Sequence, residues 1–266
     1  QPQRGRGLVE RAERLHAVVI FGHASFADQA GRAVIAFGGV KRHAADYTRA
    51  RRQNRVIAYN FYMITTVHAQ IVREALGAIF GPTALDALIS ANLGLDDLRG
   101  QFGHDEYHFD NNAFEAGHAF LAEQRQLTLE ALHRGDIPAA RTAFGRLTHT
   151  AQDFYAHSNY VDLWLARHPD SAPAEIDPAA PDLIASPALR SGKLYYPQEA
   201  LYFLRPLRQF ALSFLPRDSH AHMNLDSAER GVRFEYAFHA AVKRTVLEFE
   251  QVKAGLSAAE LSAFTA

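Results

Sequence analysis

Apolar residues recur at helical spacing through most of the chain. Within residues 44–80, for example, Ile57, Phe61, Ile64, Val67 and Ile71 follow one another at intervals of three or four residues, a spacing that puts them on one face of an α-helix. No segment has the alternating pattern of a half-buried strand, and no repeat of fixed period is present. The pattern predicts an all-α protein with helices over residues 8–21, 44–80, 83–93, 113–133, 139–166, 195–214 and 226–252.

Glycine and proline residues divide these segments. Gly81-Pro82 ends the second predicted helix, and the stretch 96–112 is a predicted loop because it is polar and contains two glycines. Five prolines lie between His168 and Pro197, which predicts a long irregular loop that is able to cover a site. We expect residues 1–64 to form a helical extension packed on the core and residues 65–266 to form the main part of a single domain.

Composition narrows the chemistry and the partners. The 28 lysine and arginine residues nearly balance the 29 aspartate and glutamate residues, so no nucleic-acid-binding patch is expected. No apolar run is long enough for a transmembrane helix, although peripheral contact with a membrane is compatible with the sequence. The chain begins at Gln1, which fits a removed signal peptide or a trimmed chain and favours a secreted or periplasmic location over a cytoplasmic one.

Histidine is abundant and cysteine is absent. The chain has 14 histidines and no cysteine, so imidazole and carboxylate groups would have to hold any metal. His149, Asp153 and His157 are each four residues apart in a helix whose other positions are largely apolar. Because each helical residue turns by about 100°, the three side chains share one strip. Three ionisable groups on a buried strip need partners, and this need predicts a metal site.

Other candidate donors are weaker when taken singly. His68 lies in an apolar helical stretch, where a hydrogen-bonded core histidine is the more common role. The pair Asp96-Asp97 precedes His108, and a loop histidine beside acids is often an ordinary surface feature. His220 and His222 precede Asp226, which could instead cap the N-terminus of the last helix.

The order of these residues resembles that in the zinc-dependent phospholipase C superfamily, which includes fungal single-strand nucleases. The run from Leu147 to Val161 is most similar to the heterokaryon-incompatibility C (Het-C) group, whose members carry a similar His-x-x-x-Asp-Phe-x-Ala-His-Ser-Asn sequence. The resemblance spans roughly Thr65 to Thr245. It implies an all-α domain with a cluster of two or three zinc ions held between helices; manganese or iron(II) would be less suited to the family pattern.

The resemblance also assigns ligands position by position. Asp153 would bridge two metals, and either Asp96 or Asp97 would help to orient or deprotonate a water molecule, so these three are the expected catalytic residues. Either His220 or His222 would be the histidine that precedes the closing acid. The implied metal ligands are His68, Asp96, His108, His149, Asp153, His157, His220, His222 and Asp226.

Three departures from the family pattern affect this assignment. His157 follows Asp153 at a shorter interval than in the phospholipases, and the closing acid, Asp226, is not glutamate. The third departure is the 67 residues that precede His68, because they prevent an amino-terminal ligand from being supplied in the family's manner. His23 is the candidate replacement. A cluster of two metals is therefore as compatible with the sequence as one of three.

Three functions follow from this interpretation. The first is a zinc-dependent phosphodiester hydrolase of the phospholipase C type, acting on a lipid or small-molecule phosphodiester through a metal-activated water. The second is another metal-assisted reaction on a lipid-like or polyketide-like molecule. The third is a non-catalytic, metal-stabilised interaction module. A di-iron bundle ranks last because the sequence has no Glu-x-x-His pairs on two helices.

Overall fold

The computed structural model describes residues 66–97, 100–101, 103–202 and 204–266. These residues form helices joined by turns and irregular segments, without a β-sheet; two isolated bridges, Ser158 to Ser191 and Lys193 to Ser219, are their only strand-like pairings. The predicted all-α class is confirmed for this part of the chain. The predicted extension over residues 1–64 lies outside it. No described helix is long and apolar enough to cross a membrane.

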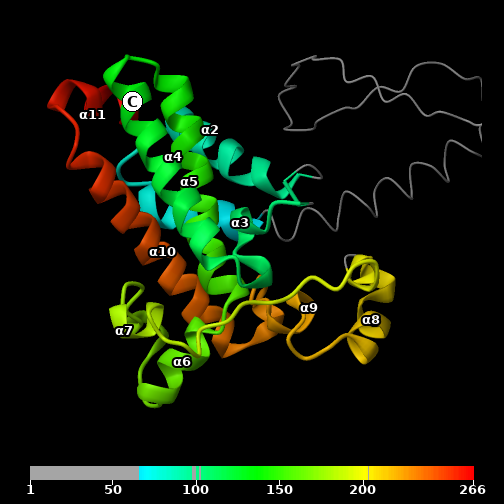
Figure 1. The fold of residues 1–266 in the computed structure, drawn as a ribbon. Helices are drawn as coiled ribbons and strands as arrows, with labels where there is room; N and C mark the ends of the chain where they lie inside the picture. Colours follow the sequence, from blue (N-terminus) through cyan, green and yellow to red (C-terminus); the bar gives the residue numbers. More distant parts are fainter. Residues whose placement is uncertain (1–65, 98–99, 102, 203) are drawn as a thin grey trace, which may run out of the picture. The chain divides into compact units, whose positions relative to one another are not determined.

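Helix α5 is the centre of the fold. Figure 1 shows α5 beside α2, α4 and α10, and these three helices make its most extensive contacts. Asp136 caps α5, since its Oδ1 accepts a hydrogen bond from the Ala139 amide at 3.1 Å. The four helices are α2 (Pro82–Leu93), α4 (Phe114–His133), α5 (Ile137–His157) and α10 (Val232–Lys253).

One glycine allows α2 and α5 to approach closely. A Cβ atom on Gly145 of α5 would lie 2.6 Å from the Ala91 Cβ and 2.7 Å from the Leu88 carbonyl oxygen of α2. Both distances are shorter than van der Waals contact, so a larger residue would push the helices apart. The absence of a side chain at residue 145 thus sets the spacing that brings α2, and the segment after it, against α5.

Aromatic packing closes the end of the bundle near the start of α5. Phe144 of α5 lies within 6.4 Å, ring centroid to ring centroid, of Phe80, Phe249 and Phe264. Phe264 belongs to α11 (Ala258–Thr265), which begins at a capping box formed by Ser257 and Glu260. This end of the core is apolar and fully buried.

Short helices surround the other end of α5. Residues 66–76 are helical and carry His68. The remaining elements are short: η1 (Gly94–Asp96), α3 (Asp105–His108), η2 (Asp110–Asn112), α6 (Tyr160–Arg167), η3 (Pro173–Glu175), α7 (Pro181–Ile184), η4 (Gln198–Leu201), η5 (Arg205–Leu207), α8 (Arg208–Phe214), α9 (His220–Met223) and η6 (Ala228–Arg230).

Several predicted boundaries were wrong. The stretch 96–112 is not a simple loop, because it contains α3 and η2. The helix predicted over 139–166 breaks at Ser158, where the backbone is extended, and that predicted over 195–214 is three short helices. The last long helix begins at Val232 and not at residue 226. Asp226 therefore does not cap it.

The long segment after α6 is irregular, as predicted, but its first part is packed against the bundle. Ile176 is fully buried, and Lys243 of α10 donates to the carbonyl oxygens of Ala174 and Ile176 at 2.7 Å. Tyr155 of α5 donates to the Pro178 carbonyl oxygen. These bonds hold residues 174–178 against α5 and α10.

Candidate metal centre

The second half of α5 carries a buried polar strip. His149, Asp153 and His157 are 0%, 1% and 6% exposed, and their spacing of four residues puts them on one face of the helix, as the sequence predicts. Two groups of donors gather around this strip. We call them the His149 cluster (His68, Asp96, His108, His149 and Asp153) and the His157 cluster (Asp110, His157, His220 and Asp226).

Asp153 is the centre of the His149 cluster. Its Oδ2 lies 2.8 Å from His108 Nδ1 and 3.1 Å from His149 Nε2, and its Oδ1 lies 3.1 Å from His68 Nε2. Three histidines from three separate segments thus point nitrogen atoms at one carboxylate. This convergence is the arrangement that a metal site requires, because bonds of about 2 Å demand that the donors meet in a small region.

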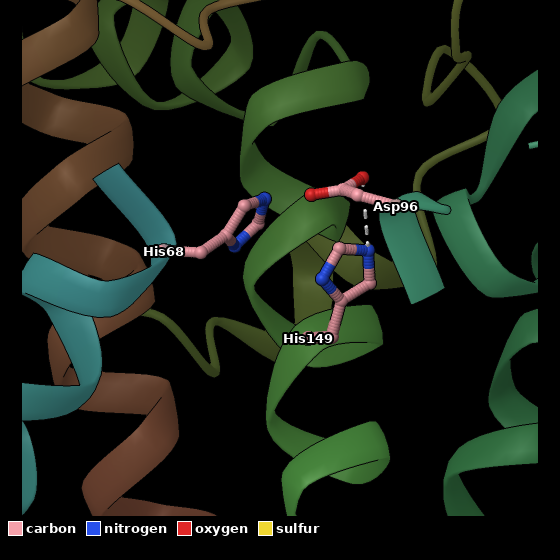
Figure 2. A group of neighbouring side chains, drawn as sticks. All are labelled: His68, Asp96 and His149. Atoms are coloured by element: carbon pink, nitrogen blue, oxygen red, sulfur yellow. Dashed lines mark ion pairs between the residues drawn. The ribbon is translucent and has the colours of Figure 1, made fainter. Parts of the chain in front are cut away.

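Asp96 supplies the second carboxylate of this cluster. Figure 2 shows the side chain of Asp96, at the end of η1, facing His149 of α5, and the side chain of His68 pointing toward both of them. The distance from His149 Nε2 to Asp96 Oδ1 is 3.7 Å. His68, Asp96 and His149 each offer one donor atom within 4.8 Å of the other two, and so do His108, His149 and Asp153.

The His157 cluster lies one turn further along α5. His157 Nε2 is 3.1 Å from Asp226 Oδ1, and His220 Nδ1 is 2.9 Å from Asp110 Oδ1. One donor atom each from Asp110, His157 and His220 lies within 4.8 Å of the other two. The two clusters are adjacent, since the His108 and His157 rings are 6.2 Å apart, centroid to centroid.

Three of these histidines use one ring nitrogen to donate a hydrogen bond to a neutral oxygen atom. His68 Nδ1 donates to Gln152 Oε1 at 2.7 Å, His108 Nε2 to the Gly100 carbonyl at 3.3 Å, and His157 Nδ1 to the His108 carbonyl at 2.9 Å. Each bond leaves the other ring nitrogen facing a carboxylate. Histidine ligands of metals are commonly oriented in this way by an outer hydrogen bond.

A second layer of hydrogen bonds fixes Gln152. Its side-chain amide donates to Thr245 Oγ1 of α10 at 3.1 Å, and its Oε1 also accepts from Asn92 Nδ2 of α2 at 3.3 Å. Asn92 in turn donates to Thr148 Oγ1 at 3.1 Å. The orientation of His68 is therefore tied to three helices of the bundle.

An unusual turn supplies both clusters from one segment. Phe109, Asn111 and Asn112 have left-handed backbone conformations, with φ values of 57°, 54° and 59°, which asparagine tolerates but which are costly for phenylalanine. The turn sends His108 to the His149 cluster and Asp110 to the His157 cluster. The Phe109 ring fits over Gly117 of α4, where a Cβ atom would lie 2.5 Å from the ring.

Charges within the site interact strongly. Burial opposes ionisation of Asp153, but the neighbouring His149, His157 and His68 hold its pKa well below the usual range. Burial likewise disfavours the protonated form of His157, yet the carboxylates of Asp153, Asp226 and Asp110 raise its pKa well above normal. The pKa of His68 rises to about 9, since Asp153 and Asp96 outweigh its burial.

In the part of the chain that the structure describes, four carboxylates of the two clusters have only histidines as basic partners. Among the described residues, no lysine or arginine forms an ion pair with Asp96, Asp110, Asp153 or Asp226. Within these residues, Asp96 Oδ2 is also buried without a hydrogen bond, and Asp153 Oδ1 faces His68 Nε2 at 3.1 Å without a well-aligned hydrogen bond. Buried oxygens in this condition are costly unless a further partner is present. The donor set therefore fits a bound cation.

The structure brings most predicted site residues together. His68, Asp96, His108, His149, Asp153, His157, His220 and Asp226 all lie in the two clusters. Asp97 does not: it is exposed, and its Oδ1 accepts a hydrogen bond from the Gly100 amide at 2.9 Å. His222 turns away and donates to the Leu212 carbonyl at 3.1 Å. His23 lies outside the described residues.

Asp110 is the residue that the sequence interpretation missed. It is 4% exposed and contacts His220 directly. The only sequence signal is its position two residues after His108, beside two asparagines that tolerate left-handed backbone. Helical periodicity gives no information here, because the turn around Phe109 is not helical throughout.

Comparison with known proteins gives a partial match. Residues 64–171 match the family model described as the VWA7 N-terminal domain. The human von Willebrand factor A domain-containing protein 7 is 33% identical over 97 residues, which cover 34% of this chain and 11% of that protein. The mouse protein is 32% identical over 98 residues, again 34% and 11%. The chain thus spans about a tenth of the length of these relatives. No solved structure matches it significantly.

These matches correct the resemblance inferred from the sequence. They connect the chain with VWA7 proteins and not with zinc-dependent phospholipases C or the Het-C group, so the expected phosphodiester hydrolase activity loses its basis. A histidine and aspartate pattern on a helix was too short to identify a family. The matched region contains the whole His149 cluster and ends before His220 and Asp226 of the His157 cluster. Residues 64–171 of this chain are similar to the N-terminal domain of VWA7.

Proposed function

We propose that this chain is a metal-stabilised interaction module, in which zinc ions hold the helices together without catalysing a reaction. The observation that supports this proposal most strongly is the set of four aspartates described above, whose basic partners among the residues that the structure describes are all histidines. Two divalent cations would balance four carboxylates. Without them the carboxylates depend on protonated histidines, and a buried carboxylate that lacks a partner is strongly destabilising.

The enclosure of the donors favours a structural role. His149 and Asp153 are almost completely buried, and His68, Asp96 and His108 are each less than 8% exposed. Structural zinc sites are closed by protein ligands, whereas catalytic sites keep a position open for water or substrate. Nitrogen and oxygen donors without thiolate suit zinc, with manganese and iron(II) as the nearest alternatives.

The partial match to VWA7 is consistent with a module. The similar region occupies about 11% of the human protein, as expected for one domain within a longer chain. When bound, the cations would supply folding free energy, because ligands dispersed between residues 68 and 226 cannot form a site in the unfolded chain. The residues of the two clusters would bind them and hold the short helices against α5.

The experiment measures metal content and melting temperature of the His149→Ala variant. Zinc per chain should fall and the melting temperature should drop by several degrees, as after loss of a structural metal. His133→Ala is the matched control, since this histidine is largely exposed and pairs with Glu260. Equal zinc content in the His149→Ala variant and the wild type would contradict the proposal.

A further inference from the structure

A polar groove adjoins the His157 cluster. It encloses about 710 Å³, which is within the range of small-ligand and peptide sites. Its walls include Ser158 and Asn159, which follow His157, and residues 223–225, which lie between His220 and Asp226. The groove is therefore built on the segments that carry the donors of this cluster, but it contains none of the four.

Arginine dominates the charged lining of the groove. Arg190, Arg217, Arg230 and Arg233 lie in its walls together with Asp162, Asp218 and Glu229. Two of the acids are neutralised, since Asp162 pairs with Arg233 at 3.0 Å and Asp218 pairs with Lys193 at 2.9 Å. Glu229 is the remaining acid of this lining. The excess charge of the groove is positive.

Two of these arginines have side chains available for a ligand. Arg190 and Arg217 are exposed, and their guanidinium groups form no ion pair or hydrogen bond with residues in the described part of the chain. Arg230, in contrast, donates to the Ala221 carbonyl at 2.6 Å and to Asn224 Oδ1 at 3.1 Å. A pair of unengaged guanidinium groups beside a groove is suited to bidentate binding of carboxylates.

Hydrogen bonds of the backbone fix the segments that carry both arginines. The Asn159 amide donates to the Arg190 carbonyl at 2.9 Å, and the Arg190 amide donates to Asn159 Oδ1 at 2.8 Å. The Lys193 amide donates to the Asp218 carbonyl at 2.8 Å, next to Arg217. The two arginines are thus held on a pre-formed wall, which lowers the entropic cost of binding.

We infer that this groove binds an acidic segment of a partner protein, one in which carboxylates alternate with apolar side chains. The arginines select carboxylates, and the half-buried side chains of Met223 and Leu225 offer apolar surface in the same groove. A sulfated glycan would use the charges but not this apolar surface. The inference rests on the proposed interaction module and names the class of its partner.

The test measures fluorescence anisotropy of a labelled octapeptide of alternating glutamate and leucine on the full, zinc-loaded chain. The wild type should bind it, and binding should weaken as salt concentration rises. The Arg190→Ala/Arg217→Ala double variant should bind about tenfold more weakly, as expected for loss of charge-assisted contacts. Arg146→Ala is the matched control, since Arg146 is exposed on α5 and does not line the groove.

Three results would overturn the inference. The first is absence of peptide binding by the wild type, and the second is equal binding of a peptide with glutamine in place of glutamate. The third is binding of a heparin octasaccharide or of phosphatidylserine vesicles that is tighter than binding of the peptide and depends on Arg190 and Arg217. This result would assign the groove to another polyanion.

Metal analysis of the same samples separates this inference from the proposed function. Peptide binding by a chain that holds no zinc would contradict the metal-stabilised module but support the groove. Zinc binding without peptide binding would overturn the groove alone. Circular dichroism of each variant ensures that weaker binding does not reflect unfolding.

Discussion

The two halves of α5 both carry buried side chains, but these are stabilised by different forces. In the first half, Phe144 packs against the rings of Phe80, Phe249 and Phe264. In the second half, Asp153 is surrounded by the nitrogens of three histidines. Apolar side chains gain free energy from burial alone, whereas buried ionisable groups gain it only when their partners are complete.

This contrast implies that one end of the helix is independent of metal and the other is not. Removal of cations should leave the packing around Phe144 unchanged. Around Asp153 it should leave carboxylates whose basic partners within the described segments are all histidines. Substitutions that change one end of α5 at a time test this difference.

The largest effect is expected from Asp153→Ala. The change removes the carboxylate that three histidines share and should lower the free energy of unfolding by at least 3–5 kcal/mol, roughly the cost of breaking a buried ion pair, with loss of zinc. Urea denaturation with and without EDTA measures both effects. EDTA should strongly destabilise the wild type but not the variant; equal sensitivity to EDTA in both would contradict the prediction.

Phe144→Ala tests the apolar end. Removal of a fully buried ring should lower the free energy of unfolding by about 3–5 kcal/mol. This loss should be the same in zinc and in EDTA, and zinc content should not change. Loss of zinc from a folded Phe144→Ala protein would show that the two halves of α5 are not independent.

Gly117→Ala tests how the turn at Phe109 positions both clusters. The added methyl group meets the buried Phe109 ring, and overpacking of this kind costs about 1–3 kcal/mol. Because the turn carries His108 and Asp110, zinc affinity should fall as well. Gly94→Ala is the control, since no atom lies within 4 Å of its added Cβ. Equal zinc affinity in the two variants would show that the turn does not position the metal ligands.

The smallest effect is expected from Glu260→Gln, near the apolar end. Hydrogen bonds from His133 and Ser257 lower the pKa of Glu260 to about 2 from its ordinary 4.5. A depressed pKa stabilises the fold above the ordinary value, and this contribution disappears as pH falls towards 2. Melting curves of variant and wild type should differ slightly at pH 6 and converge near pH 2. A difference independent of pH would exclude this origin.

The sequence predicted the parts of the site that obey helical periodicity. The spacing of His149, Asp153 and His157 was sufficient to put them on one buried face of α5. It could not choose between Asp96 and Asp97 or between His220 and His222, because these pairs lie in short helices and turns whose orientation depends on tertiary contacts. Asp110 was missed for the same reason.

Family assignment had a different weakness. The run around Asp153 suggested phospholipases, but the matches over residues 64–171 are to VWA7. Similar His and Asp spacing follows from the geometry of any helix that presents ligands on one face, so it is evidence of a metal site more than of ancestry. The alternative role of Asp226 as an N-terminal cap was wrong, because the last long helix begins at Val232, directly after Gly231.

The most direct test of the account is the metal content of the full chain. The protein is loaded with zinc, dialysed against metal-free buffer and analysed by inductively coupled plasma mass spectrometry. We predict about two to three retained zinc ions per chain, as expected for closed sites of histidine and carboxylate ligands. A folded chain that retains none would contradict the claim that cations neutralise the buried aspartates around α5.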